Sequence, residues 1–170
     1  MHSRSGLDVT GFDLIGFGGG CHRCTEAVFQ ELRGVSYVEQ GFIQSTPPYE
    51  SFSEAVIVHF NPAQVSLSVL TDIHLRTHAS GADHSMRGKY RSAIYVKGEA
   101  QRHQVEAVLA ELQTGFDRPR VTQVLDHVAF KPSDPQFQNY YKTDPERPFC
   151  KTYIDPKLVR VRKLLAEPNP

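Results

Sequence analysis

A cysteine that follows three glycines is the residue of this sequence whose position most favours reactivity. Cys21 comes after the apolar run 12–17 and Gly18-Gly19-Gly20, and an amphipathic helix is predicted to begin near it. The free N–H groups and the dipole at a helix N-terminus favour a thiolate and lower the pKa of a thiol. Glycines also let the backbone approach a ligand closely. The pattern predicts a reactive thiol; the alternative is a plain glycine-rich turn before a buried cysteine.

Two further cysteines could act together with Cys21. Cys24 lies one helical turn further on, and Cys150 lies near the C-terminal end of the chain. An odd number of cysteines, two of them in a Cys-x-x-Cys, favours redox chemistry or metal binding over structural disulfides. A zinc site would need His78 and His84 as a second ligand pair, and their spacing is too wide for one. We therefore predict redox chemistry and no metal site.

The composition limits the classes of function. The 170 residues, 39% of them hydrophobic and 22% charged, predict one domain spanning residues 1–170. Lys plus Arg equals Asp plus Glu at 19 each, which argues against binding to nucleic acid or to an anionic membrane surface. No stretch approaches the roughly 18 apolar residues of a membrane span, and residues 1–6 lack a signal core. We expect a cytoplasmic protein, and nothing in the sequence requires more than a monomer.

Hydrophobic periodicity predicts the order of the elements. Strands are expected over residues 12–17, 35–42, 54–60, 91–96 and 121–130, and helices from near 21 and over 66–78, 99–113 and 156–165. This order predicts an α+β two-layer sandwich, in which helices cover a mixed, largely antiparallel sheet with a ferredoxin-like split βαβ core. Residues 77–89 are predicted to form a functional loop. The four prolines between 131 and 153 predict a coil-rich C-terminal tail from about 131.

Several short segments of the chain carry a pattern when they are taken in order. They are Phe17-Gly18-Gly19-Gly20-Cys21, Cys24-Thr25-Glu26-Ala27-Val28-Phe29, Gly34-Val35, Gly41-Phe42, Glu54-Ala55-Val56, His78, Tyr90-Arg91-Ser92-Ala93-Ile94-Tyr95 and Asp144-Pro145-Glu146-Arg147-Pro148-Phe149-Cys150. Together they resemble the A-type peptide methionine sulfoxide reductases. The resemblance covers about residues 12–165. It implies the same fold, reduction of methionine S-sulfoxide or a related methyl sulfoxide, and no cofactor other than an external reductant such as thioredoxin.

The resemblance also assigns roles to individual residues. A sulfoxide sulfur becomes electrophilic once its oxygen is protonated, so the reaction needs a thiolate, a proton donor and a second thiol. Cys21 would attack and become a sulfenic acid. Glu54 would be the acid, with a pKa that burial could raise, and Tyr90 would orient the oxygen. Cys24 or Cys150 would resolve the sulfenic acid, or the two would act as a relay. An exposed Glu54, a core Tyr90 and a packed Cys150 are the alternatives.

The positions expected to bind substrate are Phe17, His22, Arg23, Phe42, Asp83 and Ser85. All of them except Phe17 depart from the family pattern. His22 and Arg23 replace a Phe-Trp pair that forms the pocket for the substrate methyl group, and Phe42 replaces a tyrosine. The loop aspartate is displaced from the position of Ser85 to Asp83. Gln136-Phe137-Gln138 stands where the family has Tyr-His-Gln.

These departures leave three interpretations open. In the first, sulfoxide reduction is kept and His22 and Arg23 bind an anionic or polar group beside the sulfur, since arginine pairs bidentately with carboxylates. In the second, Cys21-His22-Arg23-Cys24 is a thioredoxin-like disulfide oxidoreductase motif, because the histidine adds positive charge that stabilises a thiolate. In the third, the protein is a non-catalytic binding module.

Overall fold

The computed structural model describes residues 13–78, 91–113 and 122–166. The strands are β1 (Asp13–Gly18), β2 (Val35–Gln44), β3 (Ser53–Phe60), β4 (Ala93–Val96), β5 (Gln123–Asp126) and β6 (Ala129–Pro132). The helices are α1 (His22–Gln30), α2 (Leu67–Thr77), α3 (Glu99–Leu112), the 3-10 helix η2 (Pro135–Phe137), α4 (Tyr140–Thr143), the π-helix η3 (Cys150–Ile154) and α5 (Asp155–Ala166). None of the helices in the described ranges is long and apolar enough to cross a membrane.

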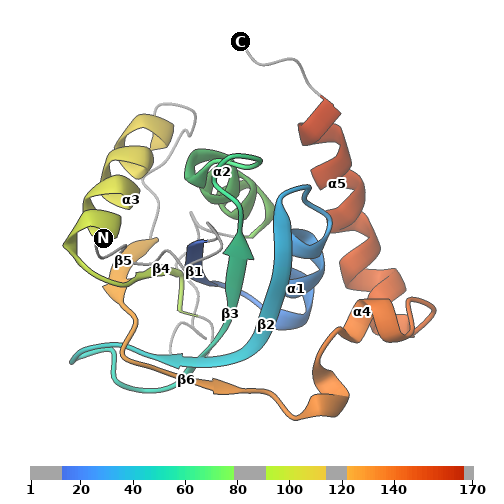
Figure 1. The fold of residues 1–170 in the computed structure, drawn as a ribbon. Helices are drawn as coiled ribbons and strands as arrows, with labels where there is room; N and C mark the ends of the chain where they lie inside the picture. Colours follow the sequence, from blue (N-terminus) through green and yellow to red (C-terminus); the bar gives the residue numbers. More distant parts are fainter. Residues whose placement is uncertain (1–12, 79–90, 114–121, 167–170) are drawn as a thin grey trace.

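The strands form one mixed sheet with the order β5-β4-β1-β3-β2-β6 (Figure 1). β1 lies between β3 and β4 and is antiparallel to both, and β2 is antiparallel to β3 and β6. Only β4 and β5 run parallel within the described residues, joined through α3. The four strands β4-β1-β3-β2 make the split βαβ core, so the predicted α+β two-layer fold is confirmed.

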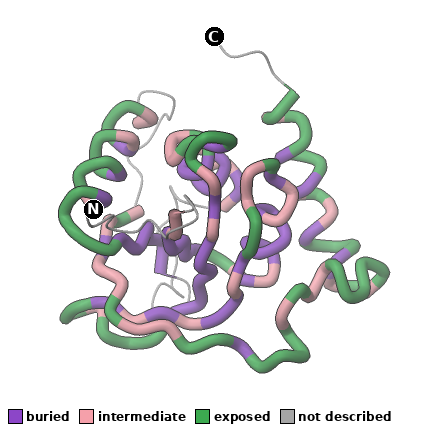
Figure 2. Tube along the Cα trace, viewed as in Figure 1, coloured by how far each residue is buried: buried purple, intermediate pink, exposed green. Residues whose placement is uncertain are grey.

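The apolar core explains why nearly all of β3 is buried. Side chains of a strand point alternately to its two faces. Val56 and Val58 belong to the large core shared with α1, α2, α3 and α5, and Ile57 packs with Ile43 and Tyr95 in a smaller cluster. Figure 2 shows buried residues along the central strands, with the outer turns of α3 and α5 exposed. A central strand covered on both faces holds its end residues at fixed positions.

The single strand predicted over residues 121–130 is wrong, because this segment forms two strands at opposite edges of the sheet. β5 extends the edge beside β4, and β6 extends the edge beside β2. The change of partner takes place between them, where the His127 N–H bonds the Val96 carbonyl and the Val128 N–H bonds the Gln44 carbonyl. Residues 127–128 therefore pass the end of the sheet, and β6 is carried to the strand that contains Phe42.

The tail after residue 131 is more regular than the predicted coil. It contains the end of β6, η2, α4, η3 and α5, and the final helix agrees with the prediction over 156–165. Its π-helix and α5 pack against α1. Single π-turns are rare and often lie at functional sites. The tail thus forms part of the structure around α1.

The glycine turn between β1 and α1 adopts a backbone that other residues avoid. Gly19 and Gly20 have φ of 140° and 74°, in the region that favours glycine. A Cβ on Gly19 would lie 2.5 Å from the His78 ring. The turn ends at Cys21, which caps α1, so the predicted arrangement of strand, glycine turn and helix start is confirmed.

Candidate active site

Cys21 lies at the N-terminal end of α1 and carries an acidic thiol. Its backbone is extended, and its side chain is half-buried. The Cys24 thiol donates a hydrogen bond to Cys21 Sγ and lowers the pKa of Cys21 to about 6. The backbone N–H groups of Arg23 and Cys24 act in the same direction, while burial and the charge of Glu54 oppose the shift. The thiolate is therefore the prevailing form of Cys21 at neutral pH.

Cys24 has the opposite character. Its hydrogen bond to Cys21 and its burial raise the pKa of Cys24 well above its ordinary value. Its Sγ also lies 3.9 Å from the Tyr153 carbonyl oxygen of η3. Cys24 thus stays protonated beside a thiolate and touches the segment of the tail that contains Cys150.

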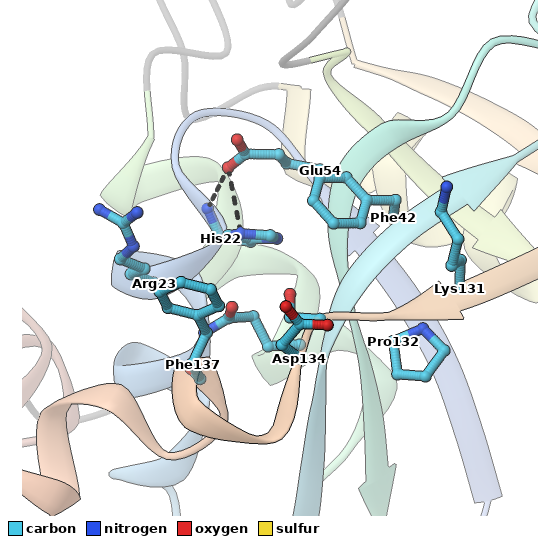
Figure 3. A pocket seen from close by; sticks show the side chains of 10 residues that line it. His22, Arg23, Phe42, Glu54, Lys131, Pro132, Asp134 and Phe137 are labelled. Atoms are coloured by element: carbon cyan, nitrogen blue, oxygen red, sulfur yellow. Dashed lines mark hydrogen bonds and ion pairs between the residues drawn. The ribbon is translucent and has the colours of Figure 1, made fainter.

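The Glu54 carboxyl meets the first turn of α1. Gly18 pairs with Ala55 across β1 and β3, and this register places the start of β3 beside the glycine turn. The His22 N–H donates to Glu54 Oε1 at 3.1 Å, and His22 Nε2 lies 3.5 Å from the same oxygen (Figure 3). The Glu54 residue is 8% exposed. The carboxyl is therefore buried at the helix N-terminus, where an acceptor for an N–H group is needed.

A pocket of about 440 Å³ opens beside His22 and Glu54. Figure 3 shows its walls, which come from α1, β2, β6 and the segment that follows β6. Phe42 and Phe137 supply aromatic surface, and Arg23, Lys131 and Asp134 supply charge. The pocket can take a small apolar group together with a polar or charged one.

The two residues that depart most from the family pattern both contact aromatic rings. The His22 ring meets the Phe42 ring at 5.1 Å between centroids. The Arg23 guanidinium lies 5.1 Å from the centre of the Tyr140 ring and 5.2 Å from that of Phe149, a cation–π arrangement. Aromatic surface near the thiol is thus supplied by β2 and the tail, although α1 itself has none at these positions.

A buried network that the sequence reasoning missed holds the tail against the pocket. Glu26 is fully buried and accepts hydrogen bonds from the N–H groups of Asn139 and Tyr140, at 2.8 and 3.2 Å, and from Gln40 Nε2 at 3.0 Å. Desolvation raises the pKa of Glu26. Gln40 also donates to the Phe137 carbonyl at 2.9 Å. The only signal in the sequence was a glutamate among the apolar residues of the first helix.

Two predicted site residues lie in the core. Phe17 is fully buried and stacks on Phe29 at 4.6 Å between ring centroids. It therefore packs against α1 in the core and does not line the pocket. Cys150 is also fully buried, and its Sγ lies 3.6 Å from the Asp144 carbonyl oxygen. The alternative of a packed Cys150 describes the structure better than a thiol in an open coil.

Other predicted residues fall outside the described ranges. They are Tyr90, Asp83, Ser85 and His84. His78 is described, and its ring stacks on His74 beneath the glycine turn. No group of three or more histidine, cysteine or acidic residues in the described ranges is arranged to hold a metal ion.

The geometry is that of a thiolate, a buried carboxyl and a pocket at a helix N-terminus. The model of the family described as "Peptide methionine sulfoxide reductase" matches residues 13–168. The chain belongs to the peptide methionine sulfoxide reductase family. The family is one of oxidoreductases, so this protein is an enzyme and not a binding module.

Known relatives and solved structures agree with this family. The peptide methionine sulfoxide reductase MsrA of Deinococcus radiodurans is 36% identical over 165 residues, which cover 86% of this chain and 79% of the relative. Mxr1 of Saccharomyces cerevisiae in reduced form has a TM-score of 0.71 at 21% identity, covering 86% of this chain and 93% of its own. Mxr1 in complex with Trx2 has a TM-score of 0.61 at 21% identity, covering 79% and 88%. These structures share the fold.

Proposed function

We propose that this protein reduces methionine S-sulfoxide or a related methyl sulfoxide, with Cys21 as the nucleophile. The observation that carries the proposal is the Cys21 thiol, whose pKa is lowered to about 6, beside a buried carboxyl and a pocket. The Cys21 thiolate attacks the sulfoxide sulfur while Glu54 gives a proton to the sulfoxide oxygen. The oxygen passes to Cys21 Sγ, which is oxidised to a sulfenic acid, and the substrate leaves as the sulfide.

The substrate side of the proposal rests on the lining of the pocket. The methyl group would lie against Phe42 and Phe137, which replace the aromatic surface that the family has next to the nucleophile. Arg23 and Lys131 would favour a substrate with an acidic group near the sulfoxide. Tyr90 stays the proposed donor to the sulfoxide oxygen. We expect peptides with glutamate beside the methionine sulfoxide to be better substrates than peptides with lysine there.

Cys24 is the proposed resolving cysteine, because its thiol already contacts Cys21. Its sulfur would attack the sulfenic sulfur, so that a disulfide forms between the two cysteines and the oxygen leaves as water. Cys150 would act later: its sulfur would attack Cys24 Sγ across the contact with η3, so that a Cys24–Cys150 disulfide forms and Cys21 leaves as a thiolate. Peptide mapping after one equivalent of sulfoxide, in Cys150→Ala, should recover the disulfide between Cys21 and Cys24.

A thioredoxin-type protein is the proposed reductant, with no further cofactor. Mxr1, which has this fold, is known in complex with Trx2. While the disulfide joins Cys21 and Cys24, the half-buried Cys21 is the sulfur that such a partner can reach, since Cys24 and Cys150 are buried. Free thiols at the site favour a reducing compartment, so we propose a cytoplasmic location. We also propose that the protein is a monomer.

The test is turnover of methionine S-sulfoxide by the purified protein with dithiothreitol or thioredoxin. We expect sulfide production by the native chain and its loss in Glu54→Gln. Glu39→Gln is the matched control, because Glu39 is also a strand carboxylate paired with a histidine, His59, at 2.7 Å but stands away from Cys21.

The opposite results are equally clear. Insulin reduction that depends on both Cys21 and Cys24 and is indifferent to Glu54 would favour a disulfide oxidoreductase. Failure to reduce any methyl sulfoxide, with the protein folded and Cys21 alkylated readily, would falsify the proposal.

A further inference from the structure

His22 is held between two groups of different chemistry. Its Nδ1 lies 2.7 Å from the Gly41 carbonyl oxygen, and its Nε2 lies 3.5 Å from Glu54 Oε1. Its side chain is 8% exposed, and its ring packs against Phe42. His22 therefore sits where the family has an aromatic side chain, yet it carries two ring nitrogens in a fixed orientation.

The contact with Gly41 determines the tautomer of His22. A carbonyl oxygen only accepts hydrogen bonds, so Nδ1 must carry a hydrogen. In the neutral ring Nε2 is then a lone pair that faces Glu54. Two groups without a proton would place lone pairs opposite each other in a buried space, which is unfavourable. The contact becomes favourable when one proton lies between Nε2 and Glu54 Oε1 and is bonded to either of these atoms.

The charged groups around His22 come from several elements. Cys21 and Arg23 flank it on α1, and Glu54 faces it from β3. β2 contributes the Gly41 carbonyl and the Phe42 ring, and Lys131 and Asp134 also line the pocket. Glu54 is the acidic group in the described ranges that the ring touches, so the proton of this pair is shared with the proposed acid.

We propose that His22 is a positioning residue that supplies Glu54 with its proton. The inference rests on the proposed reduction of a sulfoxide. Glu54 breaks its O–H bond as the sulfoxide oxygen gains the proton, which leaves a carboxylate facing the unprotonated Nε2 of His22. Solvent in the pocket then gives a proton to Nε2, and the Nε2–H bond breaks as an O–H bond forms again at Oε1. No electrons are exchanged in these steps, and one proton is consumed for each sulfoxide reduced.

An imidazole in water holds its proton to a pH about two units higher than a carboxyl does, so removal of the ring should remove a proton source that acts at alkaline pH. Two outcomes distinguish this role from a structural one. A structural role lowers activity by the same factor at every pH, whereas loss of a proton source lowers it most at alkaline pH.

His22→Asn is the decisive variant, because the asparagine amide can replace Nδ1 as the donor to Gly41 while removing Nε2. The measurement is kcat/KM for methionine S-sulfoxide with excess dithiothreitol from pH 5.5 to 9. We expect His22→Asn to be about tenfold slower than the native chain at pH 8 and within about threefold at pH 6. His59→Asn, which removes the ring paired with Glu39, is the matched control and should follow the native profile.

Two further measurements keep the result unambiguous. Alkylation of Cys21 as a function of pH in each variant corrects the profile for a changed thiolate fraction. Nitrogen NMR of the His22 ring reports the pair without turnover, and its titration should move in Glu54→Gln and stay unchanged in Glu39→Gln. A corrected His22→Asn profile parallel to that of the native chain, or a His22 titration indifferent to Glu54→Gln, overturns the inference. Absence of turnover in the native chain overturns the proposed function instead.

Discussion

Cys21 and Cys24 lie three residues apart at the start of α1, and the pKa values of their thiols are shifted in opposite directions. The pKa of Cys21 is lowered to about 6, whereas that of Cys24 is raised well above its ordinary value. The two thiols share one hydrogen bond, in which Cys24 donates and Cys21 accepts. Cys21 also accepts hydrogen bonds from the backbone N–H groups of Arg23 and Cys24, and Cys24 lies inside the core against η3.

The difference shows how two thiols within one helix turn acquire different acidities. Burial disfavours a charged sulfur at both positions, so it cannot separate them. The separation comes from the donors: Cys21 receives hydrogen bonds, and Cys24 gives one. The proposed nucleophile and the proposed resolving thiol thus already differ in acidity before any substrate binds. Four changes test this comparison, beginning with the one of largest effect.

Removing each sulfur separates the two roles. Cys21→Ser should lower single-turnover reduction of methionine S-sulfoxide by more than about a thousandfold, since the nucleophile is lost. Cys24→Ser should leave the first turnover within about tenfold of the native rate, because its hydroxyl still donates to the thiolate. Quenched-flow analysis of the sulfide checks both. Equal losses in the two variants would show that the pair acts as one unit.

The pH dependence of alkylation measures the acidity of Cys21 directly. The thiolate forms as pH rises through the pKa, so the rate with iodoacetamide should be half-maximal at about pH 6. At pH 7 about nine-tenths of Cys21 would be thiolate, against a few per cent for an ordinary cysteine. Cys24 should stay unmodified in the folded protein at that pH. A midpoint above pH 8 for Cys21 would contradict the assignment.

Removing the thiol of Cys24 should bring the pKa of Cys21 closer to its ordinary value. Cys24→Ala takes away the hydrogen bond that lowers the pKa of Cys21 most. Since a hydrogen bond contributes on the order of 1 kcal/mol, the alkylation midpoint should rise by roughly one pH unit. Cys24→Ser restores a donor and should restore most of the shift. An unchanged midpoint in Cys24→Ala would assign the acidity to the helix start alone.

Cys150, the buried third cysteine, serves as the control for the effect of Cys24 on Cys21. Cys150→Ala should leave the Cys21 midpoint unchanged, because the shift of that pKa comes from Cys24, burial, Arg23 and Glu54. The variant should cost about 1 kcal/mol of stability, since it opens a small cavity in the core. Thermal unfolding at pH 7 checks the cost, and alkylation checks the midpoint. A shifted midpoint would mean that η3 acts on Cys21 through Cys24.

The sequence predicted the fold well where the signals are local. The apolar run at 54–60 predicted the strand β3, and the helix predicted over 66–78 begins at Ser66, whose side chain accepts the Val69 N–H at 3.1 Å. The segment 121–130 was misassigned because a strand pattern does not reveal its partner. Only the free edges of the sheet, beside β4 and beside β2, divide it into β5 and β6.

By itself, the sequence determined the glycine turn, the helix start and the reactive position of Cys21. These depend on backbone conformation and on groups within a few residues, which a short stretch of chain specifies. Only the tertiary structure decided that Glu54 meets His22, that Gly41 orients the His22 ring, and that Glu26 holds the tail as a wall of the pocket. These contacts join residues that are distant in sequence through strand register and buried hydrogen bonds, neither of which periodicity encodes.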